Sequence, residues 1–134
     1  MSAADNFFDT NLLLYLFSSA SEKADRAESL LAEGGTISVQ ALNEFTAVAR
    51  RKLQLTYQEI REALDTLTAF LRVVPLSVDI HKRGLDIAER YGFSIYDALI
   101  VAAATESGCK KLFTEDLQHL QRVNDQLVII NPFV

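Results

Sequence analysis

Short apolar runs alternate with longer amphipathic stretches along nearly the whole of this sequence. The apolar runs lie at residues 6–8, 36–39, 72–76, 111–114 and 127–130. The stretches between them carry apolar residues at helical spacing, such as Leu42, Phe45 and Ala49. Parallel strands need a long crossover connection, which is usually a helix. The alternation therefore predicts an α/β fold in which helices cover a parallel sheet.

The predicted helices follow the same order along the chain. We expect a short helix through residues 12–15 and longer helices at 21–32, 56–70, 79–91 and 95–107. A further helix carries Glu44 and ends in the basic cluster Arg50, Arg51 and Lys52. The helix at 95–107 is apolar nearly all round and should therefore be buried.

Length and composition indicate a single domain that spans residues 1–134. Of the 134 residues, 49% are hydrophobic and 23% are charged, and there is no repeat or Pro/Gly-rich linker. The single cysteine, Cys109, can form no internal disulfide, which fits a cytoplasmic protein. The N-terminus lacks the basic start of a signal peptide, and no apolar run approaches the roughly 18 residues of a membrane span. We therefore expect a cytoplasmic protein without a membrane segment.

The formal net charge of −5 argues against a protein that coats nucleic acid with a broad basic surface. Such binders draw their affinity from many Lys and Arg contacts with phosphates. An enzyme that acts on nucleic acid is still compatible with this charge, because bound metal ions cancel the charge of their carboxylate ligands.

Two aspartates lie at the ends of predicted strands. Asp9 directly follows Phe7 and Phe8, and Asp116 lies just beyond the strand that ends at Thr114. Ligands bind outside the carboxyl ends of the strands in an open α/β sheet, so both aspartates are well placed for chemistry. Helix capping is an equally good explanation for a lone aspartate at such a turn, because its carboxylate satisfies free N–H groups of the next helix.

Two further carboxylates lie in predicted helices. Asp97 completes the S-x-x-D form of a capping box that starts at Ser94, and capping explains it as well as a function does. Glu44 lies on the edge of an apolar stripe, where an unpaired carboxylate is costly to bury, so it should meet a cation. If these two converge with the strand-end aspartates, their mutual repulsion requires a cation among them. Oxygen ligands without a histidine or cysteine cluster favour Mg²⁺ or Mn²⁺ over zinc.

Five segments of the chain resemble the successive motifs of a known family. They are FFDTNLLLY, SVQALNEFTAVARRK, YGFSIYDALIVAAATESGC, KLFTEDLQ and INPF. In this order they cover essentially the whole chain, and they are similar to PIN-domain ribonucleases, particularly the VapC toxins of prokaryotic type II toxin–antitoxin pairs. The resemblance implies a three-layer α/β/α fold around a parallel sheet of four or five strands, in agreement with the alternation described above.

The resemblance also implies a set of site residues. The acidic quartet of the family falls on Asp9, Glu44, Asp97 and Asp116. Asp9 and Asp97 are expected as the central metal ligands, and the other two complete the site. For Asp97, the resemblance thus favours ligation over capping. Asn11 and Thr114 match polar positions that support the site, whereas Glu115 is expected to face solvent.

An activity and partners follow from the same resemblance. Members of the family usually hydrolyse RNA as endonucleases, and such a site would use Mg²⁺ or Mn²⁺. The toxins commonly form homodimers, and a cognate antitoxin holds them inactive by placing a segment in the active-site groove. The resemblance therefore implies RNA as substrate, an antitoxin as partner and a second copy of the chain.

Positive charge near the quartet would help to bind substrate phosphates. The candidates are Arg50, Arg51 and Lys52, although cations at a helix C-terminus also complement the helix dipole without any substrate. His119 is a weaker candidate for a phosphate or base contact.

Two other functions stay open at this point. The first is a non-catalytic PIN-like module that binds RNA or protein. The second is a receiver-like domain that accepts a phosphoryl group on an aspartate. Receiver-like domains pair two acidic residues after the first strand, whereas this chain has Asp9 alone there.

Overall fold

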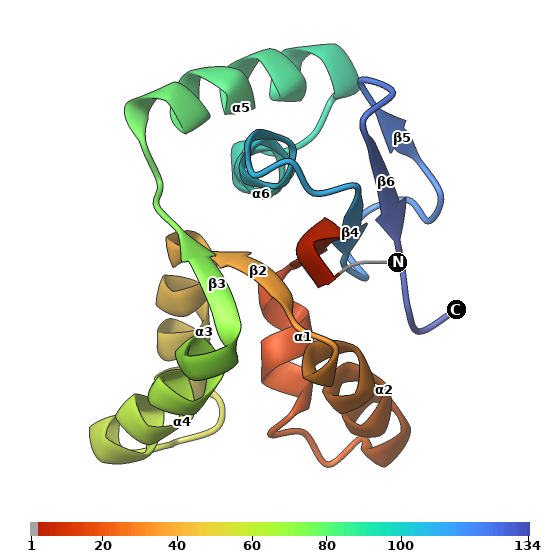
Figure 1. Ribbon diagram of the computed structural model, residues 1–134. Helices are drawn as coiled ribbons and strands as arrows, with labels where there is room; N and C mark the ends of the chain where they lie inside the picture. Colours follow the sequence, from red (N-terminus) through yellow and green to blue (C-terminus); the bar gives the residue numbers. More distant parts are fainter. Residues whose placement is uncertain (1–2) are drawn as a thin grey trace.

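The computed structural model describes residues 3–134, and it has three layers in which a six-stranded sheet lies between two groups of helices (Figure 1). The strands are β1 (Asn6–Phe8), β2 (Gly35–Ser38), β3 (Leu71–Val74), β4 (Lys111–Phe113), β5 (Arg122–Val123) and β6 (Leu127–Ile130). The helices are α1 (Thr10–Tyr15), α2 (Ser21–Ala32), α3 (Val39–Arg51), α4 (Tyr57–Phe70), α5 (Val78–Tyr91) and α6 (Ile95–Glu106), and a short 3-10 helix, η1 (Ala3–Asp5), precedes β1. In this part of the chain, no helix is both long enough and apolar enough to cross a membrane.

The strand order is β3-β2-β1-β4-β6-β5. The first five strands in this order pair in parallel, and β5 pairs antiparallel with β6. The predicted α/β/α fold is confirmed, and the five parallel strands match the expected sheet. The sequence did not predict β5, because a strand of two residues is too short to show an alternating pattern.

The start of α3 differs from the prediction. Residue 39 was expected to end a strand, but Val39 is the first residue of α3. The side chain of Ser38 caps this helix by accepting a hydrogen bond from the backbone N–H of Ala41. A serine that can cap therefore prevails over the strand preference of a β-branched residue.

Two hydrophobic clusters hold the layers together. On one face of the sheet, α5 and α6 pack over Phe7, Leu112 and Ile129. On the other face, α1 to α4 pack over a second cluster that contains Phe8 and Phe113. Successive strand residues point to opposite faces, which explains why neighbours in β1 belong to different clusters. As predicted, α6 is largely buried.

The register of the central strands brings the candidate site together. Phe8 of β1 pairs with Phe113 of β4, so the residues that follow them leave the sheet side by side. The backbone N–H of Asp9 donates to the carbonyl of Phe113 at 3.0 Å, which extends this pairing by one residue. Thr114 therefore lies next to Asp9 although 105 positions separate them.

Candidate active site

Asp9 is the most buried member of the quartet. It caps α1, and its Oδ1 accepts a hydrogen bond from the backbone N–H of Thr10 at 2.7 Å. The hydroxyl of Thr114 donates to Oδ2 at 2.8 Å. Burial raises the pKa of Asp9 from 3.8 to about 6, although both hydrogen bonds lower it. The charges of Asp116 and Glu44 add smaller upward contributions to this pKa.

Asp116 is connected to Asp9 through two polar side chains. The amide of Asn11 donates to Asp116 Oδ2 at 3.1 Å and to Thr114 Oγ1 at 3.4 Å. The same Thr114 oxygen accepts the backbone N–H of Asp116 at 3.1 Å. Desolvation raises the pKa of Asp116, and the negative charge of Asp97 contributes to the increase. Asn11 and Thr114 thus contact the carboxylates directly, and their supporting role stays a prediction.

The side chain of Glu44 is half-buried, and its carboxylate accepts hydrogen bonds from uncharged side chains. Its Oε1 accepts hydrogen bonds from the hydroxyl of Thr10 at 3.3 Å and from the amide of Gln40 at 3.1 Å. No lysine, arginine or histidine among residues 3–134 forms an ion pair with it. The cation expected beside Glu44 is therefore not a side chain of the described part.

Gln40 also connects α3 with the start of α6. Its Nε2 donates to the carbonyl of Tyr96 at 3.1 Å, directly before Asp97. The backbone N–H of Asp97 donates to Ser94 Oγ at 3.2 Å, so one half of the predicted capping box is present. The other half is absent, because the Asp97 carboxylate accepts no hydrogen bond from any described residue. Capping therefore leaves this carboxylate available for a ligand.

Three charge interactions connect the four carboxylates at the carboxyl edge of the sheet. Charge interactions link Asp9 with Glu44 and Asp116, and Asp116 with Asp97. Within residues 3–134, no three acidic, histidine or cysteine side chains are already arranged to hold a metal ion. The donors nevertheless have the chemistry that a hard cation prefers, because all are oxygens. Two buried amide oxygens beside them, Asn11 Oδ1 and Gln40 Oε1, have no hydrogen-bond partner.

The comparison with protein families agrees with this geometry. A model of the PIN domain matches residues 7–126, which is most of the chain. The chain belongs to the PIN domain family. No curated protein matches its sequence.

Solved structures similar to this PIN domain include several toxins. A toxin–antitoxin complex from Klebsiella pneumoniae matches with a TM-score of 0.72 and 25% identity, over 95% of this chain and 97% of that one. VapC20 of Mycobacterium tuberculosis, a toxin that cleaves the sarcin-ricin loop, matches with a TM-score of 0.67 and 20% identity, over 83% and 91%. VapBC2 of Rickettsia felis, bound to a fragment of its promoter DNA, matches with a TM-score of 0.66 and 20% identity, over 92% and 96%.

The predicted phosphate contacts lie farther along α3. Arg51 is exposed, about 10 Å beyond Glu44 along the helix axis. Arg50 donates to the carbonyl of Leu55 at 2.9 Å and lies over the ring of Tyr57, so it fastens the connection to α4. Lys52 lines a groove of about 480 Å³ that begins at Asn11 of the site.

His119 has a structural contact in this PIN domain. Its Nδ1 accepts the backbone N–H of Asn131 at 2.9 Å, which joins the segment after β4 to the end of β6. The other ring nitrogen is not used in this contact, and the side chain is exposed.

The expectation for Glu115 was wrong. Glu115 is half-buried and pairs with Lys23 of α2 at 3.0 Å. The hydroxyl of Tyr15 donates to its other carboxylate oxygen, and Lys23 also donates to that hydroxyl at 3.1 Å. These contacts hold the segment that carries Asp116 against α1 and α2. Their partners lie 92 and 100 positions apart, a separation that sequence spacing does not show.

Proposed function

We propose that this PIN domain is a Mg²⁺- or Mn²⁺-dependent endoribonuclease and the toxin of a toxin–antitoxin pair. The observation that carries this proposal is the buried carboxylate of Asp9, which lies at the carboxyl edge of the sheet beside two other carboxylates. Its raised pKa reflects the cost of a negative charge at this place. A divalent cation among the oxygens offsets that cost, and perturbed carboxylates of this kind concentrate at active sites.

In this proposal, each residue of the site has a role. Asp9 and Asp97 would hold the cation, and Glu44 and Asp116 would complete the site directly or through water. Thr114 keeps Asp9 in position, as its hydrogen bond to Oδ2 suggests. A cation held by these residues would supply a water of lowered pKa and charge to polarise a phosphate oxygen of the RNA.

The similar structures support the toxin role and the partner. The complexes from Klebsiella pneumoniae and Rickettsia felis contain a toxin with its antitoxin. We extend this assembly to the present chain and propose a cognate antitoxin, a homodimer and a cytoplasmic location. The groove that begins at Asn11 gives a partner segment an approach to the site.

The decisive experiment is cleavage of a mixed RNA pool by the purified, partner-free protein. Asp97→Asn is the best variant, because its carboxylate accepts no hydrogen bond from described residues and its loss should leave the fold intact. Asp65→Asn, at an exposed position of α4, is the matched control. We expect cleavage with Mg²⁺ or Mn²⁺, no cleavage with EDTA or Asp97→Asn, and full cleavage with Asp65→Asn.

A non-catalytic PIN-like module is the remaining alternative. If wild-type protein binds RNA but cleaves none in the presence of metal, the nuclease proposal is wrong and the binding module is favoured. The receiver-like alternative has lost its basis, because the chain belongs to the PIN family.

A further inference from the structure

One row of side chains crosses the sheet at the ends of the strands opposite to the quartet. Lys111 of β4 pairs with Val128 of β6, and Val128 pairs with Arg122 of β5. Directly paired residues point to the same face of a sheet. The row therefore faces the same side as Phe113 and Ile130, the side that α1 to α4 cover elsewhere. Arg122 is exposed, and Lys111 and Val128 are half-buried, so this part of the face is open.

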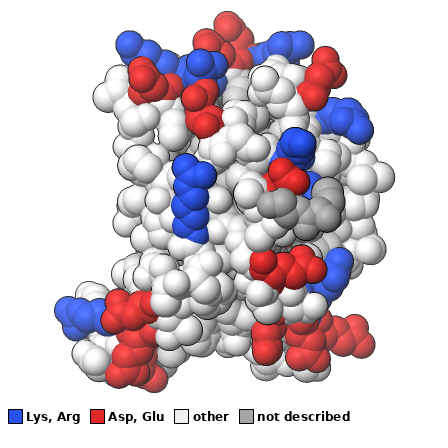
Figure 2. All heavy atoms as spheres, viewed as in Figure 1, with Lys and Arg blue, Asp and Glu red and all other residues white. Residues whose placement is uncertain are grey.

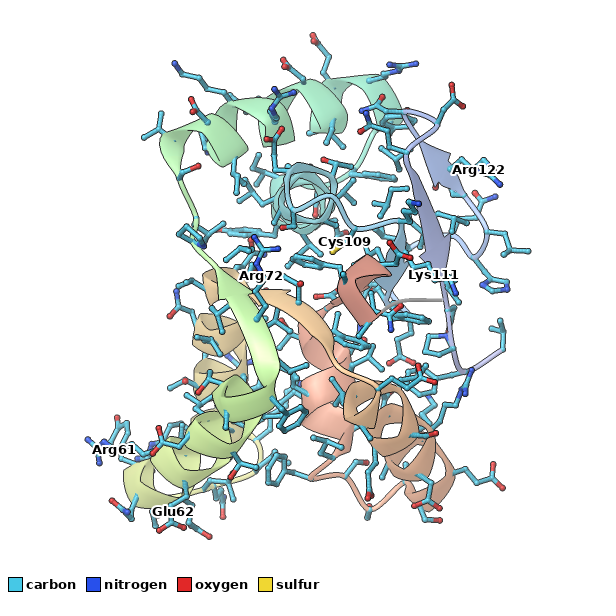
Figure 3. All side chains as sticks on the ribbon, in the orientation of Figure 1. Arg61, Glu62, Arg72, Cys109, Lys111 and Arg122 are labelled. Atoms are coloured by element: carbon cyan, nitrogen blue, oxygen red, sulfur yellow. The ribbon has the colours of Figure 1, made fainter. Side chains whose placement is uncertain are left out.

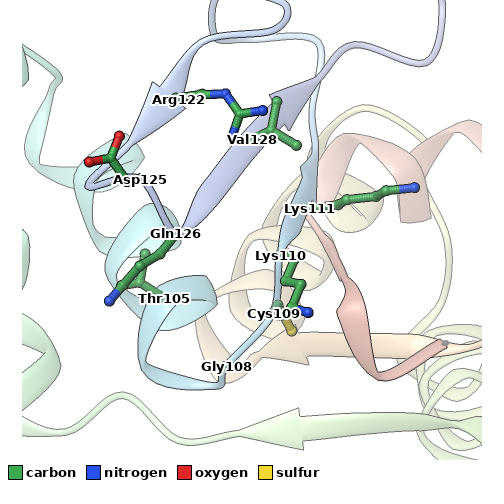
Figure 4. A pocket seen from close by; sticks show the side chains of 9 residues that line it. All are labelled: Thr105, Gly108, Cys109, Lys110, Lys111, Arg122, Asp125, Gln126 and Val128. Atoms are coloured by element: carbon green, nitrogen blue, oxygen red, sulfur yellow. The ribbon is translucent and has the colours of Figure 1, made fainter. Parts of the chain in front are cut away.

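Residues of this row line two hollows, which share Lys111 as a lining residue. The first measures about 540 Å³ and is lined by Lys110, Arg122 and Val128 among others. The second measures about 660 Å³ and extends from Lys111 past Ile130 to Arg26 of α2. Figure 4 shows the guanidinium of Arg122 beside Val128, with Lys111 extending from β4 away from the first hollow. We call these hollows together the β4–β6 groove, defined by Arg26, Lys110, Lys111, Arg122, Val128 and Ile130.

The groove concentrates positive charge in an acidic protein. Its walls carry the four cations named above and two acidic residues, Glu33 and Asp125, whereas the whole chain has a net charge of −5. Among described residues, Lys110, Lys111 and Arg122 form no ion pair. Figure 2 shows acidic and basic side chains mixed at the top of this view, mainly acidic ones at the bottom and more basic than acidic ones between. Unpaired cations around a hollow favour an anionic ligand.

The groove also has apolar residues between its cations. Val128 and Ile130 are half-buried and lie on the same face of β6. A single-stranded nucleic acid combines regularly spaced phosphates with apolar base faces, so it can contact both kinds of side chain. Lys111 precedes Asp116 by five residues, which limits their Cα separation to about 18 Å. A strand that reaches the quartet can therefore reach the groove within several nucleotides.

We propose that the β4–β6 groove binds single-stranded RNA a few nucleotides away from the phosphate that is cut. Lys111 and Arg122 contact backbone phosphates there, and Val128 contacts the sugar and base between them. The groove adds affinity for the substrate without taking part in the chemistry. This inference rests on the proposed function for the identity of the RNA as substrate.

The binding test uses the double variant Lys111→Gln with Arg122→Gln. The matched control is Arg61→Gln with Lys82→Gln, which removes the same charge from exposed positions of α4 and α5. Figure 3 shows Arg61 at the far side of the molecule from Lys111 and Arg122. Circular dichroism and thermal unfolding establish that both variants are folded. Fluorescence anisotropy with a labelled single-stranded oligoribonucleotide, in EDTA, gives the dissociation constant at several salt concentrations.

We expect the groove variant to bind RNA several-fold more weakly than the control. The slope of log K against log salt should fall by about 1.4, because each lost phosphate contact on a single strand removes about 0.7. Equal affinity and equal slope for the two variants would overturn the proposal and leave the groove to an anionic protein segment.

A cleavage test separates this proposal from the proposed function. With a long RNA, the groove variant should show a raised KM and an unchanged kcat, whereas a short oligonucleotide that covers the quartet alone should be cut as by wild type. If wild type cuts no RNA, the proposed function fails, and the anisotropy measurement alone then decides whether the groove binds RNA. If wild type cuts RNA and the groove variant matches the control with both substrates, the groove proposal fails.

Discussion

The two edges of the central sheet carry opposite charges in very different surroundings. At the carboxyl edge, Asp9 is buried and hydrogen-bonded, and its neighbours Glu44 and Asp116 also accept hydrogen bonds from polar side chains. At the amino edge, Lys111 and Arg122 lie in open hollows without an ion pair among described residues. The carboxylates are therefore part of the hydrogen-bonded structure, whereas the cations lie on the surface.

The charged side chains at the two edges should therefore contribute differently to the stability of the fold. A buried carboxylate with a raised pKa destabilises the folded state when it is ionised. Active sites commonly lower the stability of a protein in this way. Exposed cations are already solvated, so they cost the fold little and gain little from it. Substitutions should therefore change activity and stability together at the carboxyl edge, and affinity alone at the amino edge.

The largest expected effect comes from Asp9, which directly follows β1, and is compared with that of Asp5, which directly precedes it. Asp9→Asn should lower the rate of RNA cleavage by about 10³-fold, because losing a metal ligand removes roughly 4 kcal/mol of transition-state stabilisation. Asp5→Asn, the matched change at the half-buried residue just before β1, should leave the rate within a factor of about 2, because Asp5 lies at the end of the strand opposite to the quartet. Initial rates at saturating Mn²⁺ measure both. Equal loss in the two variants would contradict the contrast between the edges.

The second prediction concerns stability and pH. The pKa of Asp9 is about 6 in the folded protein, compared with 3.8 for an aspartate in an unfolded chain. The folded state binds the proton of the Asp9 carboxyl group more tightly than the unfolded state does. The contribution of Asp9 to the free energy of unfolding is therefore fully present below pH 4 and is lost as the pH rises from about 4 to 6. The loss amounts to about 3 kcal/mol. In metal-free buffer at pH 7.5, Asp9→Asn should therefore be more stable than wild type.

Urea unfolding of wild type and Asp9→Asn over this pH range measures the difference directly. Added Mn²⁺ should raise the stability of wild type and leave the variant nearly unchanged, because the variant has lost a ligand. A stability difference that does not depend on pH would show that Asp9 ionises as freely in the fold as outside it.

The third prediction tests the support of the site. Thr114→Val removes the hydroxyl that donates to Asp9 and accepts from Asn11, while keeping the shape of the side chain. Affinity for Mn²⁺ should fall about 10-fold, as for other residues that orient metal ligands. Isothermal titration calorimetry measures this affinity. Thr66→Val, at an exposed position of α4, should bind Mn²⁺ like wild type.

The smallest expected effect is at the amino edge. The double variant Lys111→Gln with Arg122→Gln should change the free energy of unfolding by less than about 0.5 kcal/mol, as is usual for surface positions without partners. Urea unfolding at neutral pH measures it. A loss comparable to that at the carboxyl edge would show that these cations support the fold, and the contrast between the edges would disappear.

Sequence patterns predicted the layers better than the details of the site. Apolar alternation placed all five parallel strands, because each is long enough to bury side chains on the two faces. Strand-end position singled out Asp9 and Asp116, since parallel strands deliver such residues to one edge. For Asp97, capping and ligation have the same local pattern, and family resemblance alone favoured ligation.

The contacts that join distant segments could not be predicted from spacing. Glu115 was expected in solvent, but Lys23 and Tyr15 engage it from helices about a hundred residues earlier. Gln40 had no distinguishing signal either, because a polar residue in the first turn of a helix is usual on the surface. Its partner Tyr96 is 56 positions away.

The bridge formed by Gln40 has a mechanical consequence. It joins α3, which packs on one face of the sheet, to α6, which packs on the other. A cation shared by Glu44 and Asp97 would fasten the same two helices, so the two outer layers of the molecule would open together instead of separately. Metal loading should then appear as slower amide exchange in helices on both sides of the sheet, far beyond the residues that touch the ion.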